Sequence, residues 1–461
     1  MRLSNLGAYE ITADESVSWV AASAPTVTDV FRVTSQVTYG KLGVYEFVLR
    51  FWILAFGDSL VSMRALSGVL GTIAIPLVFA VTVELFAGGA DWPGLPREEA
   101  EVAAAIGALI FAVNLVAIRL SRETRMYPFL MLAVLGHIWF LLRAVRQGGA
   151  LNYAAATFLI LTAMAANYFA ALILWTEGAW LLWRAWSRGW RPRSVWTWSA
   201  LGLAVALSTA CFSYPRLVPK RLQTERFREW YRVFGGGSGY VLRDFLGQAT
   251  RGLIAPVTIG LAGWGSLQSW RRTPEALWFT VLWMLGPVVL LAWFFKQSIL
   301  LLAVPAYAWI PVFIQRYFFV SFAPFCILIG FGIWELRPNS RRVAALALVI
   351  VLALGKIRAY EPTIDDLEWG VQWREAAEIV EPDLRKGRVV NVLFFPSAVQ
   401  YYLRDDRAVN PALLQHSATN ADTLILTDLA VTISDAKAVA KLRGTYPHVV
   451  AHLHGVWVLR R

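Results

Sequence analysis

The sequence has few of the residues on which small secreted and soluble proteins depend. Two cysteines occur among its 461 residues, Cys211 and Cys326, and each lies inside an apolar segment, which argues against a disulfide framework. Charged residues make up 16% of the chain and hydrophobic residues 57%, a balance outside the usual range of soluble domains. No secretory signal pattern precedes the first polar segment, and no nucleic-acid-binding motif is present. The expected class is therefore a polytopic membrane protein that does not bind nucleic acid.

Apolar segments fill most of the first 359 residues. About ten of them are long enough for a helix that crosses a bilayer, which needs about 20 apolar residues. They lie at about 65–87, 101–118, 128–146, 151–167, 169–186, 196–213, 252–270, 276–295, 317–335 and 342–358. The amphipathic segment 45–57 is too short to cross, so we expect an interfacial helix there. Pro305 and Pro311 interrupt the apolar segment 299–314, which predicts a re-entrant or loop segment.

Arginines alternate between successive loops, and this pattern orients the predicted spans. The positive-inside rule places the arginine-bearing loops in the cytoplasm, and it accounts for much of the net charge of +12. These loops carry Arg97 (beside Glu98 and Glu99), Arg143, Arg146, Arg184, Arg188, Arg191, Arg193, Arg271, Arg272, Arg337, Arg341 and Arg342. The outward-facing set is then 1–64, 119–127, the joint near Asn167 and Tyr168, 214–251, 296–316 and the tail from about 360.

This orientation predicts a multi-pass protein of a bacterial-type inner or plasma membrane, in contact with membrane lipids. Its first polar segment and its tail share the extracytoplasmic side. A translocated first segment normally follows a span or a signal. We therefore expect a further helix upstream of residue 1, encoded from an earlier start site, which makes about 10–11 spans. The alternatives are an upstream helix that this sequence does not include, and export of the segment without one.

The tail, residues 360–461, changes character and predicts a small extracytoplasmic α/β domain, separate from a membrane domain of residues 1–359. Helices are expected at 373–380, 397–403 and 434–442, and strands at 389–395 and 423–427. Two paired strands, 449–454 and 456–459, are expected to end the chain. The tail contains no glycine-rich phosphate loop. His452 and His454 alternate along a strand with no cysteine or carboxylate around them, so we interpret them as structural residues.

The most informative polar stretch runs from Glu10 to Trp19 and contains the adjacent carboxylates Asp14 and Glu15. Ionisable side chains this close to membrane spans favour a functional interpretation. The alternative is that Asp14 or Glu15 caps the helix that follows, a common role for such residues.

Four stretches, in order along the chain, resemble the polytopic glycosyltransferases of the GT-C fold. The nearest branch includes the protein O-mannosyltransferases and the lipid A aminoarabinose transferase, which are families 39 and 83. The stretches are Asp14-Glu15; 41–45 running into 56–59 and 64–67; 121–127; and Arg316-Tyr317 with Pro324 after them. The entry to the tail at Trp373-Arg374 also resembles bacterial members. Family members commonly carry two prolines after a His or Lys; here Lys41 keeps the cation, but Leu42 and Gly43 replace the prolines.

The resemblance implies a transfer reaction in the cell envelope, on the extracytoplasmic side. The donor is a sugar on a polyprenyl phosphate, and the acceptor is a lipid, a glycan or a protein. The reaction needs a base for the acceptor hydroxyl and cations for the departing phosphate. No cofactor is certain, and a divalent cation is left open. The implied catalytic residues are Asp14 as the base, Glu15 as its support and Glu123 near the acceptor. The implied ligands of the lipid phosphate and sugar are Lys41, Arg125, Tyr127, Lys296, Arg316 and Tyr317.

Glu123 and Tyr127 are four residues apart, so on a helix they would share a face. A structural role is the alternative for each of these residues. Glu123, Arg125 and Tyr127 could form a charged cluster at a helix end, and Lys41, Lys296 and Arg316 could extend to lipid headgroups.

The long 214–251 loop is a candidate flap over the site. A membrane transporter or lipid flippase is the rival class; it would need polar spans and an inverted repeat, and the sequence has few of the first and no sign of the second. A catalytically inactive scaffold is the third possibility.

Overall fold

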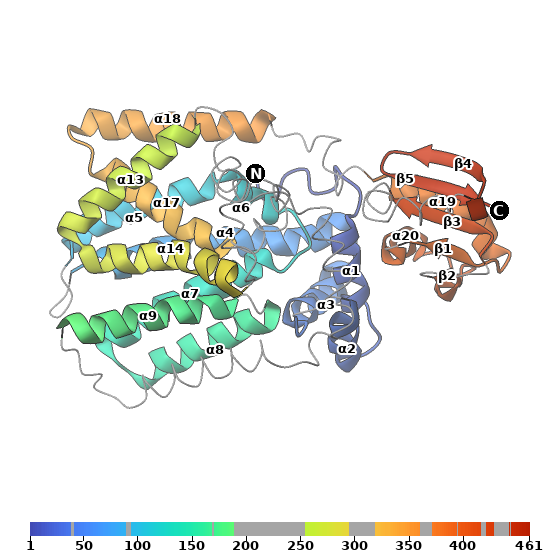
Figure 1. Ribbon diagram of the computed structural model, residues 1–461, viewed down its shortest axis with the longest axis horizontal. Helices are drawn as coiled ribbons and strands as arrows, with labels where there is room; N and C mark the ends of the chain where they lie inside the picture. The colour runs from blue at the N-terminus through green and yellow to red at the C-terminus, as the bar shows by residue number, and fades with distance from the viewer. Residues whose placement is uncertain are drawn as a thin grey trace.

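The computed structural model describes residues 1–37, 41–88, 94–167, 170–188, 254–294, 319–359, 371–393, 395–415, 421–427, 442 and 444–461. Within these ranges the chain forms a long helical bundle, and a small sheet lies beyond one end of it (Figure 1).

The helices of the bundle follow the predicted apolar segments. Predicted spans are covered by α4 (Leu60–Phe86), α7 (Tyr127–Gln147), α8 (Ala150–Ala166), α9 (Ala171–Arg188), α13 (Ile254–Arg272), α14 (Pro274–Phe294), η2 (Phe319–Ser321) with α17 (Phe322–Trp334), and α18 (Asn339–Ala359). The span expected at 101–118 is instead two helices, α5 (Arg97–Ala112) and α6 (Leu115–Leu120). Asn114 causes the break, because its side chain accepts a hydrogen bond from the Ala117 amide and caps α6. The span expected at 196–213 and the segment 299–314 lie outside the described residues.

By length and apolarity, two of the described helices, α4 and α7, are sufficient to cross a membrane; α8 and the stretch Phe319–Trp334 are shorter apolar helices. Large apolar side chains are exposed on the outer faces of the bundle, among them Ile73, Phe158, Val343 and Val351. Such surfaces are unfavourable in water and are expected against lipid.

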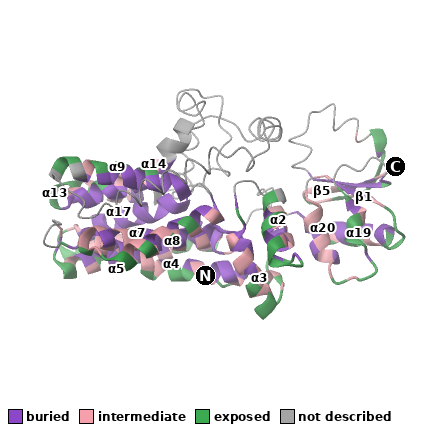
Figure 2. Ribbon diagram, turned by 90° about the horizontal axis from the view of Figure 1, so that it is seen from below, coloured by how far each residue is buried: buried purple, intermediate pink, exposed green. Residues whose placement is uncertain are grey.

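The centre of the bundle is α17, in which every residue is buried (Figure 2). It crosses α13 so closely that a Cβ on Gly332 would lie 2.1 Å from the Leu261 carbonyl oxygen, and a Cβ on Gly265 would lie 2.1 Å from that of Leu328. Small residues at such crossings let backbones approach, which is how membrane helices gain packing energy.

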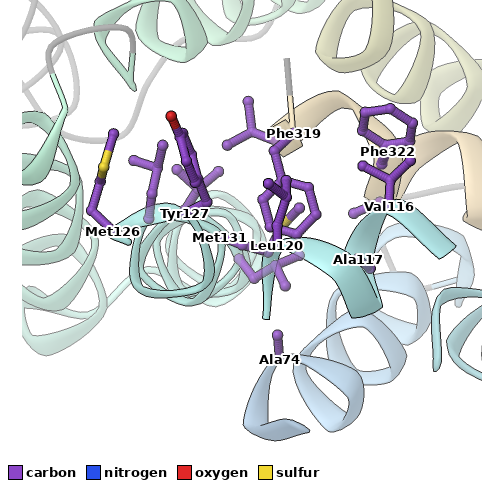
Figure 3. Packing of buried hydrophobic residues seen from close by; sticks show 14 of the residues in the cluster. Ala74, Val116, Ala117, Leu120, Met126, Tyr127, Met131, Phe319 and Phe322 are labelled. Atoms are coloured by element: carbon purple, nitrogen blue, oxygen red, sulfur yellow. The ribbon is translucent and has the colours of Figure 1, made fainter. Parts of the chain in front are cut away.

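At the end of α17 nearest the sheet, residues from four segments of the chain pack together (Figure 3). Leu120 of α6 and Tyr127 at the start of α7 lie with Phe319 of η2, Phe322 of α17 and Ala74 of α4. This packing holds the 121–126 loop between α6 and α7 at one end of the bundle.

The arginine-bearing ends of the helices meet at the opposite end (Figure 1). Arg272, at the end of α13, contacts Glu335 after α17 at 2.8 Å and Glu99 of α5 at 3.0 Å. Arg146 of α7 contacts Glu84 of α4 at 3.5 Å. The described loops therefore divide between the two ends as the arginine pattern predicts.

Two buried pairs join helices inside the bundle. His137 of α7 lies 2.8 Å from Glu177 of α9, and its Nδ1 lies 2.8 Å from the carbonyl oxygen of Ala156 in α8. Arg184 of α9 pairs with Glu275 of α14. Each of these buried ionisable groups has its partner on another helix, which is the arrangement that lipid surroundings favour.

Three short helices cover the end of the bundle that faces the sheet: α1 (Ala13–Ala22), α2 (Val27–Val37) and α3 (Val44–Phe56). The helix expected at 45–57 is confirmed as α3. Its Phe51, Leu54 and Phe56 are 52%, 69% and 64% exposed, and the position at a membrane surface stays a prediction. The sequence pattern did not predict α2.

The C-terminal sheet region (residues 371–461) has the strand order β2-β1-β3-β5-β4. Its strands are β1 (Val390–Val392), β2 (Leu414–Gln415), β3 (Thr423–Thr427), β4 (His448–Leu453) and β5 (Val456–Arg460), accompanied by α19 (Trp373–Arg385), α20 (Pro396–Leu403) and η3 (Pro411–Leu413). β1 runs parallel to β2 and β3, whereas β5 is antiparallel to β3 and β4, which confirms the paired strands at the end of the chain. The two-residue β2 was not predicted. The helix expected at 434–442 falls outside the described residues, apart from Leu442.

The sheet region is attached to the first polar segment through α20. Ser16 of α1 hydrogen bonds Ser397 at 2.8 Å, and the Ile11 amide donates to the Tyr402 hydroxyl at 3.1 Å. Asp58, before α4, accepts hydrogen bonds from Trp19 at 3.1 Å and from Arg404 at 2.9 Å. These contacts place the sheet region directly beside α1, on the side of the bundle away from the arginine-bearing ends.

Candidate active site

The first polar segment begins α1 with a capping box. The Glu15 amide donates to the Thr12 hydroxyl at 3.2 Å, and the Thr12 amide donates to the Glu15 carboxylate at 3.0 Å. The capping interpretation therefore holds for Glu15. It does not hold for Asp14, because Thr12 is the N-cap residue.

Glu15 is completely buried and is bound on several sides. Arg64 of α4 donates to its two oxygens at 2.8 and 2.7 Å, and the Thr124 amide donates to it at 2.8 Å. Burial alone would raise the pKa of Glu15, but the charge and hydrogen bonds of Arg64 hold it below the ordinary value. A carboxylate this well satisfied is a poor proton acceptor. Its physical effect is to tie α1, α4 and the 121–126 loop together.

Asp14, in contrast, keeps a side chain that is 39% exposed. Arg125 lies beside it, with its guanidinium 3.4 Å from the Asp14 carboxylate and 2.9 Å from the Asp14 carbonyl oxygen. Burial would lower the pKa of Arg125, but the neighbouring Asp14 raises it above the ordinary value. The adjacent carboxylates thus differ in kind: Glu15 is enclosed by structural contacts, and Asp14 reaches solvent.

Lys41 lies in a loop that two contacts hold in place. The Leu42 amide donates to the Ala165 carbonyl of α8 at 2.9 Å. Gly43 has a φ of +89°, and a Cβ there would lie 2.8 Å from the Thr34 hydroxyl, so only glycine fits. This glycine turn shapes a loop in which the resembling family commonly has prolines.

The Lys41 side chain is buried, with its Nζ 3.9 Å from a carboxylate oxygen of Glu46 in α3. Among the described residues this Nζ has no hydrogen-bond partner. Burial and, to a smaller extent, the charge of Arg125 lower the pKa of Lys41 to about 7, although Glu46 and Asp14 oppose the change. A buried ammonium with no hydrogen bond is costly, and an anionic ligand would relieve that cost.

Glu123 and Tyr127 are close in sequence but do not share a helix face. Residues 121–126 form turns and bends, and α7 begins at Tyr127, so the four-residue helical spacing does not apply. Glu123 is buried, and its carboxylate is 3.8 Å from Arg119. Tyr127 is also buried, within the packing described above.

The predicted ligands Lys296, Arg316 and Tyr317 lie outside the described residues, as does the predicted flap at 214–251. Sequence reasoning gave no role to three residues at the site: Arg64, Ser18 and Glu46. Glu46 could have been noticed as the one acidic residue of a mainly apolar helix, in its first turn.

Within the described ranges, no group of three or more His, Cys, Asp and Glu side chains is arranged to hold a metal ion. A cavity of about 540 Å³ lies between the start of α4 and the sheet region. Its walls include Arg374, Tyr401, Tyr402 and Arg404. It adjoins the first polar segment through Tyr402, which accepts from the Ile11 amide, and it adjoins Asp58 through Arg404.

No protein-family model matches the chain, and no curated protein matches its sequence. The fold has clear similarity to ArnT from Cupriavidus metallidurans. The crystal structure of that protein bound to undecaprenyl phosphate superposes with a TM-score of 0.58 and 12% identity, covering 99% of this chain and 95% of that chain. The apo crystal structure of the same protein superposes with a TM-score of 0.56 and 13% identity, covering 98% of this chain and 94% of that chain. The resemblance noted in the sequence is therefore confirmed for the fold: the chain is an α-helical polytopic protein of the GT-C fold with a small C-terminal α/β region.

Proposed function

We propose that this protein is an integral-membrane glycosyltransferase. It moves a sugar from a polyprenyl-phosphate donor to an acceptor at the end of the bundle that carries α1–α3. Residues 1–359 form the transferase domain, and residues 360–461 form an α/β domain on the same, extracytoplasmic side. The GT-C fold supports the class of protein. The proposal rests on one observation within it: the buried Lys41 ammonium has no hydrogen bond and lies in the same site as Arg125 and the half-exposed Asp14.

The chemistry follows from the charges at the site. The acceptor hydroxyl oxygen attacks the anomeric carbon of the donor, and the bond from that carbon to the phosphate oxygen breaks. Asp14 takes the hydroxyl proton, and the phosphate departs with the bonding electron pair. Lys41 and Arg125, whose side chains are both buried, stabilise the charge that grows on the phosphate. ArnT binding undecaprenyl phosphate supports the choice of a polyprenyl phosphate as the ligand.

The other predicted residues keep supporting roles in this proposal. Glu15 positions Asp14 through the capping box, and Glu123 faces the acceptor. Tyr127, Lys296, Arg316 and Tyr317 are proposed contacts of the lipid phosphate and sugar.

Lys41→Ala tests the phosphate site. We expect the affinity for undecaprenyl phosphate in detergent to fall about 10- to 100-fold, because a hydrogen bond to a charged group contributes about 1.5–3 kcal/mol. The matched control is Lys386→Ala, which removes an exposed lysine from the C-terminal sheet region. Calorimetric titration gives both affinities. Equal affinities for Lys41→Ala and the control would remove Lys41 from the site.

Labelling of single cysteines tests the orientation. Ser340→Cys and Ala408→Cys introduce exposed thiols near the arginine-bearing end and in the sheet region, in a background without Cys211 and Cys326. A membrane-impermeant maleimide added to spheroplasts should label position 408 and leave position 340 unlabelled until the cells are opened. The reverse pattern would place the site in the cytoplasm, where the proposed lipid donor would not be used.

A further inference from the structure

A line of buried polar side chains connects Asp14 to Lys41 through two residues that the proposed mechanism does not use. Arg125, which lies beside Asp14, donates to the Ser18 hydroxyl at 3.3 Å. The Ser18 hydroxyl donates to the Glu46 carboxylate at 3.4 Å, and the same carboxylate oxygen lies 3.9 Å from the Lys41 ammonium. The charges along this line alternate from Asp14 to Lys41, so each cation of the site lies beside a carboxylate.

Three atoms in this line have no hydrogen-bond partner among the described residues. They are Nζ of Lys41, Oε2 of Glu46 and Nε of Arg125, and all three are buried. They come from three separate segments: the loop before α3, the first turn of α3, and the 121–126 loop. Buried polar atoms are nearly always satisfied in native proteins, so three such atoms on neighbouring side chains favour a bound ligand at this place.

Glu46 has the structural support that an anion needs in such a place. It is 2% exposed and lies in the first turn of α3, where the partial positive charge of the helix end favours a carboxylate. Gly43, the N-cap residue of α3, has a φ of +89°, and Lys41 lies two residues before it.

We propose that Glu46 is a positioning residue for Lys41, which keeps the ammonium charged and aimed into the site while the donor is absent, with Ser18 coupling it to Arg125. This inference rests on the proposed function, because it concerns the lysine that receives the donor phosphate. Without Glu46, Asp14 would be the remaining carboxylate among the described groups that face Lys41, whereas Arg125 would keep both Asp14 and Glu123.

The consequence is a specific dependence of donor binding on pH. Burial and the charge of Arg125 lower the pKa of Lys41 to about 7, whereas the charges of Glu46 and Asp14 act to raise it. The ammonium form binds an anion, so affinity is present below this pKa and is lost as the pH rises through it. Removing the Glu46 charge lowers the pKa of Lys41, and the loss of affinity then begins at a lower pH. An opposite charge within about 4–6 Å shifts a pKa by about 1–3 units, so we expect a displacement of about 1 unit or more.

Glu46→Gln tests the proposal, because it keeps the size of the side chain and removes its charge. The affinity for undecaprenyl phosphate in detergent is measured from pH 5.5 to pH 8.5 for the wild type, Glu46→Gln and Lys41→Arg. We expect Glu46→Gln to match the wild type at the acid end and to bind about tenfold more weakly at pH 8. Lys41→Arg carries a cation that does not titrate in this range, so the pH dependence of its affinity reports the titration of the undecaprenyl phosphate itself. This dependence is subtracted from the profiles of the wild type and Glu46→Gln.

Glu46→Asp provides a second variant in case Glu46→Gln does not fold. It keeps the charge but withdraws it by one methylene, so its midpoint should lie between those of the wild type and Glu46→Gln. A midpoint in either variant equal to that of the wild type overturns the role of Glu46. If the wild type does not bind undecaprenyl phosphate at any pH, the proposed function fails instead, so the two failures are distinguishable.

Discussion

Asp14→Asn is expected to abolish sugar transfer while leaving the protein folded and able to bind undecaprenyl phosphate. The substitution keeps the size of the side chain and an oxygen that can accept from Arg125, and it removes the ability to take a proton. The capping box should be unaffected, because Thr12 and Glu15 form it. A positioned general base contributes about 10²–10⁴-fold to the rate, so turnover should fall by that factor.

The measurement is the rate at which undecaprenyl phosphate is released from a panel of undecaprenyl-phosphate-linked sugars in liposomes that also hold candidate acceptors. Asp405→Asn is the matched control, since its carboxylate is 89% exposed in the C-terminal sheet region and it should keep full activity. Near-normal turnover of Asp14→Asn would mean that the base lies elsewhere, and Glu123 would be the next residue to test.

Arg64→Met is expected to have the largest effect on stability. It leaves the Glu15 carboxylate buried without its main partner, and breaking a buried ion pair in this way costs about 3–5 kcal/mol. Arg97→Met is the matched control, because the Arg97–Glu101 pair is largely exposed and such pairs contribute about 0–1 kcal/mol. Denaturant titration of each variant in mixed micelles gives its free energy of unfolding, and the difference from the wild type measures each change.

The double variant Glu15→Gln/Arg64→Met separates a buried charge from a lost contact. It removes both charges, so it should recover part of the stability that Arg64→Met loses. A double variant that is as unstable as the sum of the two single variants would show that the pair is not coupled. The described interaction between α1 and α4 would then have no energetic role.

Hydropathy predicted most of the helices, because a helix surrounded by lipid needs a long apolar segment. The strand β3 was predicted at Thr423–Thr427, where five residues that are buried in the structure are bounded by polar residues. The break at Asn114 could not be seen this way, since one polar residue barely changes the mean apolarity of an 18-residue segment. β2 was missed because it has two residues and exists only through parallel pairing with β1.

The site residues differ in how far the sequence reveals them. Asp14 and Lys41 could be selected because they lie in polar segments and match a family pattern. The sequence left the capping role open to either Asp14 or Glu15. The capping box with Thr12 and the contact with Arg64, 49 residues away, assign the structural contacts to Glu15. The position of Glu46 beside Lys41 depends on a positive φ at Gly43, which no periodicity reports. The attachment of the sheet region through Tyr402 and Ile11 joins residues 391 positions apart.

The most direct test of the account is a cryo-electron-microscopy map of the wild-type protein prepared with undecaprenyl phosphate. We predict density for the phosphate within hydrogen-bond distance of the Lys41 ammonium and beside Arg125, with Asp14 facing the open side of the site. A lipid phosphate bound elsewhere, with Lys41 still enclosed and without a ligand, would contradict the proposed function.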